Sequence, residues 1–272
     1  MNLTREQMLE EMGLGPLWRL RTAEPVAQMP AEDGARSAPA PDSAPCESET
    51  PAASAPQRPA APVAVRSADA VATLGWPELR QTIADCTACG LCRERKQAVP
   101  GVGDESADWL FIGEGPGAEE DARGEPFVGQ AGKLLDAMLA AIDLERGHNV
   151  YIANAVKCRP PGNRTPEADE MAACWPYLKR QIALIRPKLI VLLGRAALQA
   201  VLHEERALGA SRGKTFEYRD GELVVPVIVT YHPAYLLRNL PDKAKAWEDL
   251  CFARRLMREQ QAAGMDLPLS PA

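Results

Sequence analysis

The chain has 272 residues, of which 46% are hydrophobic, enough for the core of one sizeable domain. Its net charge of −6 argues against a polycation that coats nucleic acid. Residues 1–75 hold 6 basic and 10 acidic residues of the chain's 31 and 37, which leaves 25 and 27 for the remainder. Any basic surface on the main body must therefore be a local patch. The apolar runs are too short to span a bilayer and the N-terminus lacks a signal-peptide core, so we expect a cytoplasmic protein with no membrane contact.

Residues 1–22 show a short amphipathic pattern. Thr4 and Gln7 have the spacing of a capping box, and Leu17, Trp18 and Leu20 add an apolar face. A helix of this length is unstable alone, so the element either docks onto a partner protein or folds back onto the main body.

Residues 23–70 have the composition of a disordered linker. They hold nine of the chain's 24 prolines among Ala, Ser and Glu, and no aromatic residue. Such a segment buries too little apolar surface to offset the entropy lost on ordering. We expect the folded domain to occupy residues 71–262, followed by a tail over 263–272.

Four short apolar runs, separated by helix-length segments, predict the fold of this domain. This alternation is typical of an α/β protein with three layers, in which helices cover both faces of a central four-stranded parallel sheet. Residues 212–221 are compatible with a small hairpin before the last strand. The predicted strands are Trp109 to Gly113, Val150 to Asn154, Leu189 to Gly194 and Val224 to Tyr231.

Polar or glycine residues follow each predicted strand. The first strand runs into the glycine-rich turn at 113–117 (GEGPG), Asn154 ends the second, Arg195 follows the third and His232 follows the fourth. Because the C-terminal ends of parallel strands share one edge of the sheet, these residues are expected to line one crevice. Each of them alone would be an ordinary turn or loop residue.

The cysteines form a second pattern. In a cytosolic protein, paired cysteines are more often metal ligands than disulfides. Thr165 is placed to cap a helix that would carry Cys174, whereas Cys251 is assigned to the core. Spacing alone leaves an all-cysteine zinc site, an iron-sulfur cluster or scattered core thiols open. The pattern consists of Cys86, Cys89 and Cys92, and then Cys158 and Cys174.

Three segments carry a resemblance to a known family. GEGPGAEEDARGEPFVGQAGKLL, YIANAVKCRPPGNRTPEADEMAAC and YHPAYLLRN resemble the signature regions of the family 4 uracil-DNA glycosylases, which carry a [4Fe-4S] cluster. The resemblance covers roughly residues 80–260 and implies the uracil-DNA glycosylase fold. It also implies that the cluster ligands are Cys86, Cys89, Cys158 and Cys174, whereas Cys92 falls where the family varies.

The resemblance also implies roles for the residues of the crevice. Gly113, Glu114 and Gly115 would border a flipped uracil, Phe127 would stack on it, and the Asn154 amide would read its Watson-Crick edge. A neutral His232 would donate to uracil O2 as negative charge develops there. Glu114 and Glu120 are both candidates to orient water or to offset the positive charge of the sugar.

Candidate DNA contacts follow the histidine. Leu236 and Leu237 beside Arg238 suit a wedge that enters the base stack, although the same residues could begin a buried helix. A local basic patch for the phosphates would draw on Lys157, Arg159, Arg164, Arg212 and Lys214.

The sequence thus predicts a base-excision-repair hydrolase that removes uracil from DNA and leaves an abasic site. We expect a monomer that acts on single- or double-stranded uracil-containing DNA, with a further protein partner possible for residues 1–22. Two alternatives remain: a damaged-DNA-binding iron-sulfur module without turnover, and a flavodoxin-like nucleotide-binding protein that uses GEGPG as a phosphate loop.

Overall fold

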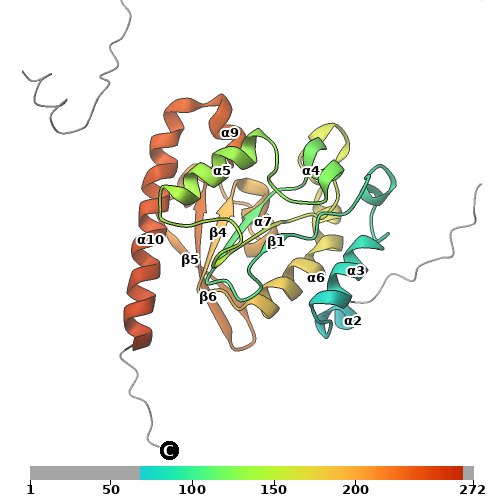
Figure 1. Cartoon of the computed structure of the whole chain (residues 1–272), viewed down its shortest axis with the longest axis horizontal. Helices are drawn as coiled ribbons and strands as arrows, with labels where there is room; N and C mark the ends of the chain where they lie inside the picture. Colours follow the sequence, from blue (N-terminus) through green and yellow to red (C-terminus); the bar gives the residue numbers. More distant parts are fainter. Residues whose placement is uncertain (1–67, 266–272) are drawn as a thin grey trace, which may run out of the picture. The chain divides into compact units, whose positions relative to one another are not determined.

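The structure, a computed structural model, describes residues 68–265 (Figure 1). The predictions for the amphipathic element at 1–22, for the linker as far as residue 67 and for the tail from residue 266 lie outside these residues. Residues 68–70, which the sequence assigned to the linker, begin the first described helix, α2 (Ala68–Ala72). None of the helices within 68–265 is both long and apolar enough to cross a membrane.

The domain is built on one six-stranded sheet in the order β1-β3-β2-β4-β6-β5. The four central strands run parallel, as the sequence predicted, and the three-layer α/β architecture is confirmed. The sheet is larger than expected because β1 and β5 pair antiparallel to its two edges. Residues 212–221 do not form a separate hairpin before the last strand, because they contribute the single strand β5, which forms a hairpin with the last strand, β6. The strands are β1 (Val102–Gly103), β2 (Trp109–Gly113), β3 (Val150–Asn154), β4 (Leu189–Leu193), β5 (Thr215–Asp220) and β6 (Leu223–Thr230).

Helices cover both faces of the sheet, so β2, β3 and β4 are buried along their whole length. On one face Phe111 and Val191 pack with α5 (Gln130–Ala140) and α10 (Lys243–Met265). On the other face α6 (Ala168–Ile185) and α7 (Arg195–Leu202) pack on the alternate residues of the same strands (Figure 1). Burial on both faces explains why these strands read as continuous apolar runs.

Shorter helical segments lie in the connections between these elements. They are α3 (Trp76–Ala84), η1 (Gly90–Arg93), α4 (Ala118–Arg123), η2 (Pro161–Asn163), α8 (Leu208–Ser211), α9 (Pro233–Arg238) and η3 (Leu240–Asp242).

A third apolar cluster joins α2, α3 and η1 to α6, and it contains the buried Cys158 and Cys174. Cys174 lies on α6 as predicted, but the helix starts at Ala168 with Glu167 as its N-cap, so the assignment of Thr165 as the cap was wrong. Cys251 was also misplaced, because it is exposed on α10 instead of packed in the core.

Candidate functional site

Residues that follow all four parallel strands line one pocket of about 680 Å³. Glu114 follows β2, Asn154 ends β3, Arg195 begins α7 after β4, and His232 follows β6. Parallel strands deliver their C-terminal ends to one edge of the sheet, which is where open α/β sheets bind ligands.

A glycine allows two side chains of the pocket to approach each other closely. Gly113 pairs with Asn154 in the parallel register of β2 and β3. A Cβ atom at residue 113 would lie 2.5 Å from Asn154 Oδ1 and 2.5 Å from Phe127 Cζ. Real Cβ atoms do not make contacts this short, so a side chain at residue 113 would separate the aromatic ring from the amide.

Phe127 reaches the pocket from a backbone conformation that is rare for a non-glycine residue, with φ of 55°. Arg146 holds this segment by donating to the carbonyl oxygens of Pro126 (2.9 Å) and Phe127 (2.8 Å). Gly132 makes room for it, since a Cβ there would lie 1.7 Å from the Phe127 carbonyl oxygen. The backbone therefore fixes where the ring lies.

Asn154 presents an unsatisfied acceptor to the pocket. Its side chain is 2% exposed, and Oδ1 has no hydrogen-bond partner among the described residues. The Lys157 ammonium group donates to the Asn154 backbone carbonyl at 2.8 Å and to Gln181 Oε1 at 2.6 Å. A buried acceptor without a donor costs about 1–3 kcal/mol, which a ligand with a matching N–H recovers.

His232 is held as a neutral donor. The backbone N–H of Ala234 donates to Nδ1 (3.1 Å), which leaves the proton of a neutral ring on Nε2. Burial, reinforced by the positive charge of Arg238 and opposed by Glu120, lowers the pKa of His232 from 6.5 to about 4. The ring also stacks with Phe127, with centroids 5.4 Å apart and an interplanar angle of 30°.

The two candidate carboxylates have different surroundings. Glu120 accepts backbone N–H bonds from Gly117 (3.1 Å), Val128 (2.9 Å) and Gly129 (3.0 Å), so it ties the start of α4 to the segment after Phe127. Glu114 lines the pocket, where burial raises its pKa; the Thr165 hydroxyl and the charge of Arg195 act in the opposite direction. Of these two carboxylates, only that of Glu114 accepts no backbone hydrogen bond from the described residues.

The cysteines gather in a separate small pocket, lined by Cys86, Cys89, Cys92, Cys158 and Cys174. Within residues 68–265 no three His, Cys, Asp or Glu side chains lie close enough to hold a single metal ion. Burial raises the pKa of the Cys158 thiol to about 11 and that of Cys174 to about 12. Thiols this basic need a compensating positive group to ionise.

Donors already point at four of these sulfurs. Arg95 donates to Cys158 Sγ (2.8 Å), and backbone N–H groups donate to Cys174 Sγ (from Lys157, 3.2 Å) and to Cys86 Sγ (from Ala88, 3.5 Å). The backbone of Leu91 bonds the Cys89 sulfur. No such donor reaches Cys92 Sγ from the described part of the chain. Hydrogen bonds to sulfur are a feature of protein-bound iron-sulfur clusters.

Burial and ion pairing argue against several of the candidate DNA contacts. Leu236 is 1% exposed and belongs to the core, whereas Leu237 is 41% exposed. Lys157 is buried, Arg164 pairs with Glu170 at 2.7 Å, and Arg212 pairs with Asp249 at 2.7 Å. Lys157 and Arg212 are therefore held inside the protein, whereas the Arg164 side chain is 37% exposed and still lines the pocket. The exposed Lys214 and the half-buried Arg159 also remain available.

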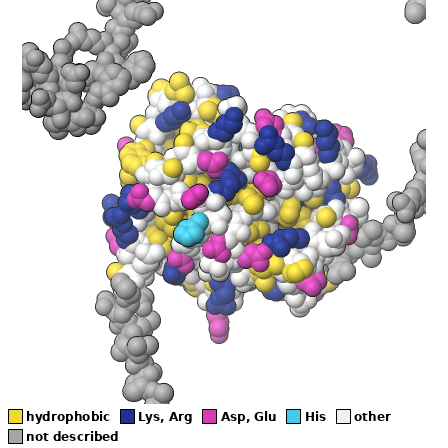
Figure 2. Space-filling view, in the orientation of Figure 1, with side chains coloured by type: hydrophobic (Ala, Val, Ile, Leu, Met, Phe, Trp, Pro, Cys, Tyr) yellow, Lys and Arg dark blue, Asp and Glu magenta, His cyan; other side chains and the backbone are white. Residues whose placement is uncertain are grey.

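Basic and acidic side chains are interspersed over the face drawn in Figure 2 and do not gather in one basic field. This agrees with the nearly neutral balance that the sequence gives for residues after 75. On this face, contacts to a polyanion would come from individual side chains and not from a broad positive field.

Two contributors were not recognised from the sequence. Thr165 hydrogen-bonds Glu114, although its position before Pro166 suggested a helix cap. Arg95 bonds the Cys158 sulfur from 63 residues away, and its only sequence signal is a place shortly after the first cysteines. Both contacts depend on tertiary structure that local patterns do not encode.

Comparisons with known proteins agree with this arrangement. The profile described as the Uracil DNA glycosylase superfamily matches residues 100–251. The type-4 uracil-DNA glycosylase of Archaeoglobus fulgidus is 46% identical over 164 residues, 59% of this chain and 82% of the relative. Those of Pyrobaculum aerophilum (41% over 179 residues, 64% and 91%) and Sulfurisphaera tokodaii (44% over 177 residues, 63% and 80%) are similarly close. The chain therefore belongs to the uracil-DNA glycosylase superfamily, as a member of its type-4 group.

Proposed function

We propose that the protein removes uracil from DNA by hydrolysing the N-glycosidic bond, leaving an abasic site for base excision repair. The observation that carries this proposal is Asn154 Oδ1, which is buried in a pocket beside the Phe127 ring and has no hydrogen-bond partner within residues 68–265. A flipped uracil offers an N3–H to this oxygen and a flat face to the ring.

The same amide explains how cytosine would be rejected. Uracil presents a donor at N3 and an acceptor at O4, whereas cytosine presents the reverse at the two equivalent positions. With cytosine in the pocket Asn154 Oδ1 would stay unsatisfied and face a lone pair. Sites built to bond a specific polar group reject an analogue that lacks it by large factors.

Two side chains would assist bond cleavage. The Nε2–H of neutral His232 would donate to uracil O2 while negative charge builds on the leaving base. Glu114, whose carboxylate is not engaged by the backbone, would orient the attacking water or offset the positive charge of the sugar. Glu120, the other candidate, instead holds the loop that carries Phe127.

The DNA strand would be held beside the pocket by the remaining exposed candidates. Leu237 would enter the space left by the extruded base, and Arg238, Lys214 and Arg159 would contact phosphates. Arg159 already donates to Asn163 Oδ1 (2.7 Å), at the rim of the pocket.

The test is excision from a single-stranded oligonucleotide with one uracil, read as strand cleavage after alkali. Asn154→Ala should lower the rate by about 100-fold or more, as expected when a polar contact to the reacting base is lost. Gln199→Ala is the matched control, because it removes an amide side chain that lies outside the pocket lining and bonds Glu205. Binding of the oligonucleotide without any cleavage would instead favour the non-catalytic module.

We further propose that Cys86, Cys89, Cys158 and Cys174 hold a [4Fe-4S] cluster. These four sulfurs line one pocket and each accepts an N–H bond, which suits a negatively charged thiolate-iron group. Such a cluster would join η1 to α6 without taking part in excision, which needs no electron transfer.

Iron content and visible absorption test the ligand set. The wild-type protein should contain iron and absorb broadly near 400 nm, a rough expectation for such clusters. Cys174→Ser should lose both. Cys92→Ser should keep them, although Cys92 lines the same pocket, because no donor among the described residues bonds its sulfur. Colourless wild-type protein with bound zinc would refute the cluster.

A further inference from the structure

The pocket is too large for a pyrimidine base alone. Its volume of about 680 Å³ is within the range of sites for drug-sized ligands. Besides Phe127 and His232, a second aromatic pair lines it: Tyr231 and Tyr235, with ring centroids 5.0 Å apart and an interplanar angle of 16°. Nothing in the proposed reaction uses this second pair.

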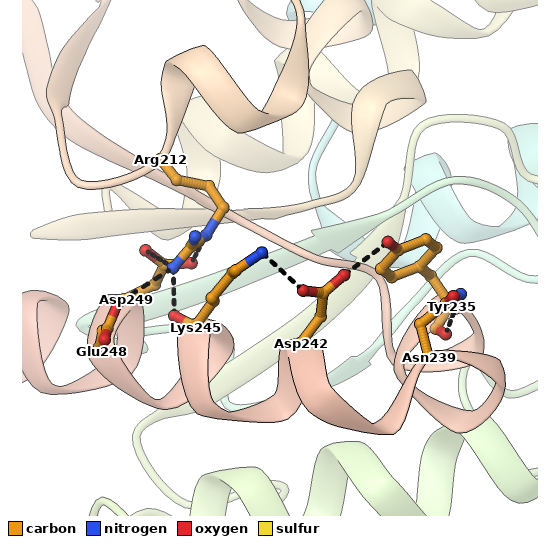
Figure 3. Close-up of polar contacts among 7 residues, drawn as sticks. All are labelled: Arg212, Tyr235, Asn239, Asp242, Lys245, Glu248 and Asp249. Carbon is orange, nitrogen blue, oxygen red and sulfur yellow. Dashed lines mark hydrogen bonds and ion pairs between the residues drawn. The ribbon is translucent and has the colours of Figure 1, made fainter.

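The tyrosine pair is fixed from both sides. The Arg212 guanidinium lies 5.0 Å from the Tyr231 ring centroid and is itself held by Asp249 at 2.7 and 3.1 Å. The Tyr235 hydroxyl donates to Asp242 at 2.6 Å, and Asp242 pairs with Lys245 (Figure 3). Both rings remain partly exposed. An aromatic surface held in place before binding loses little entropy when a ligand stacks on it.

Two of the three arginines that line the pocket have no salt-bridge partner among the described residues. Arg195 and Arg238 both line it, both are exposed, and neither side chain makes a salt bridge or hydrogen bond within residues 68–265. Arg164, a third arginine of the lining, is instead paired with Glu170. Unpaired guanidinium groups beside an aromatic surface match the phosphate and the base of a nucleotide.

We propose that this outer part of the pocket is a subsite for the nucleotide next to the uridine on the same strand. Its base packs against the Tyr231–Tyr235 pair and its phosphate binds Arg195 and Arg238. The inference rests on the proposed uracil excision. With such a subsite the enzyme would recognise two successive nucleotides. The first is recognised by the identity of its base, and the second only by having a base that can stack.

The substrate can be altered to test this without changing the protein. Single-stranded oligonucleotides with one uracil are prepared with a normal base, or with a base-free tetrahydrofuran residue, on the 5′ or the 3′ side. Removing the base on one of these sides should raise KM for the wild-type enzyme by between about 5-fold and 100-fold, the usual worth of one stacked base. Removal on the other side should have little effect.

Variants of Tyr235 then assign the effect to the ring. Tyr235→Leu should raise KM for the normal oligonucleotide and abolish the penalty for the missing base. Tyr235→Phe also loses the bond to Asp242 but keeps the aromatic ring. The missing base should therefore still raise KM for this variant. Trp247→Leu, which removes an exposed aromatic ring outside the pocket lining, is the matched control and should keep the penalty too.

The outcomes separate the two proposals. The subsite is refuted if neither removal of the 5′ base nor removal of the 3′ base raises the wild-type KM. It is also refuted if the missing base raises KM for Tyr235→Leu as much as for the wild type. Failure of the wild-type enzyme to excise uracil from any of the oligonucleotides would refute the proposed function itself.

Discussion

Close contacts at single residues decide the geometry of the proposed uracil site. Phe127 has a positive φ, a conformation that costs of the order of 1–3 kcal/mol in a non-glycine residue and persists only where its surroundings enforce it. Arg146 and Gly132 provide those surroundings, and Gly113 lets the ring approach Asn154. We infer that the pocket is preorganised by backbone positions as much as by its polar side chains.

Gly113→Ala tests this preorganisation. The new methyl group would lie 2.5 Å from both Asn154 Oδ1 and Phe127 Cζ, so one or both must move by about 1 Å. Displacements of this size in an active site cost about 100-fold in rate. The excision rate should therefore fall by about that factor. Gly209→Ala, whose added Cβ meets nothing within 4 Å, should leave it unchanged; equal rates for both variants would contradict the preorganisation.

The pH dependence of excision tests the roles of Glu114 and His232. Burial raises the pKa of Glu114 above 4.5, so an ionised Glu114 is lost, and kcat/KM falls, as the pH drops through that raised value. His232, with a pKa lowered to about 4, adds no inflection near 6.5. Glu114→Gln should lower the plateau of kcat/KM and remove the acid limb that Glu114 causes. An acid limb that survives in this variant would assign it to another group.

At the scale of elements, the arginines show why sequence and structure differ. Arg212 was a reasonable DNA contact on charge alone, but it bridges the segment before β5 to α10 by bonding Asp249, which is 37 residues away and 2% exposed (Figure 3). Asp249 also accepts from Thr230 at the end of β6. Whether a cation is free or paired depends on such distant partners, which composition and spacing do not reveal.

Arg212→Ala should therefore act on stability. Removing the arginine of this buried ion pair leaves the Asp249 carboxylate without a compensating positive charge, which costs about 3 kcal/mol or more. Urea unfolding should show this loss, while the salt dependence of DNA binding stays as in the wild type. The exposed Lys214, two residues later, should behave in the opposite way: Lys214→Ala should preserve stability and reduce the salt slope by about 1. A reduced slope for Arg212→Ala would restore Arg212 as a phosphate contact.

For the whole molecule, the sequence predicted the central layer well and its periphery less well. The four parallel strands are apolar because both of their faces are buried, so their positions could be read directly. Strand β1 has two residues and no pattern of its own, and it exists only because β3 offers an unpaired edge. The sequence motifs also located residues that line one pocket, since strand ends converge by topology. The sequence could not show that backbone N–H groups engage Glu120, because those bonds depend on how residues 128–129 fold back onto α4.

The last prediction concerns the cysteine pocket. Both α3 and η1 pack on the rest of the domain through the third apolar cluster and the cysteines. Removing the iron of the proposed cluster with an oxidant and a chelator should leave the sheet intact, since its two apolar layers do not include the cysteines. Hydrogen exchange should therefore rise in residues 76–93 and stay slow in β2, β4 and β6. A uniform rise would mean that the cluster supports the whole fold, and no rise would mean that it does not tie this segment. Cys251→Ser, at an exposed cysteine outside the pocket, should match the wild type before and after iron removal.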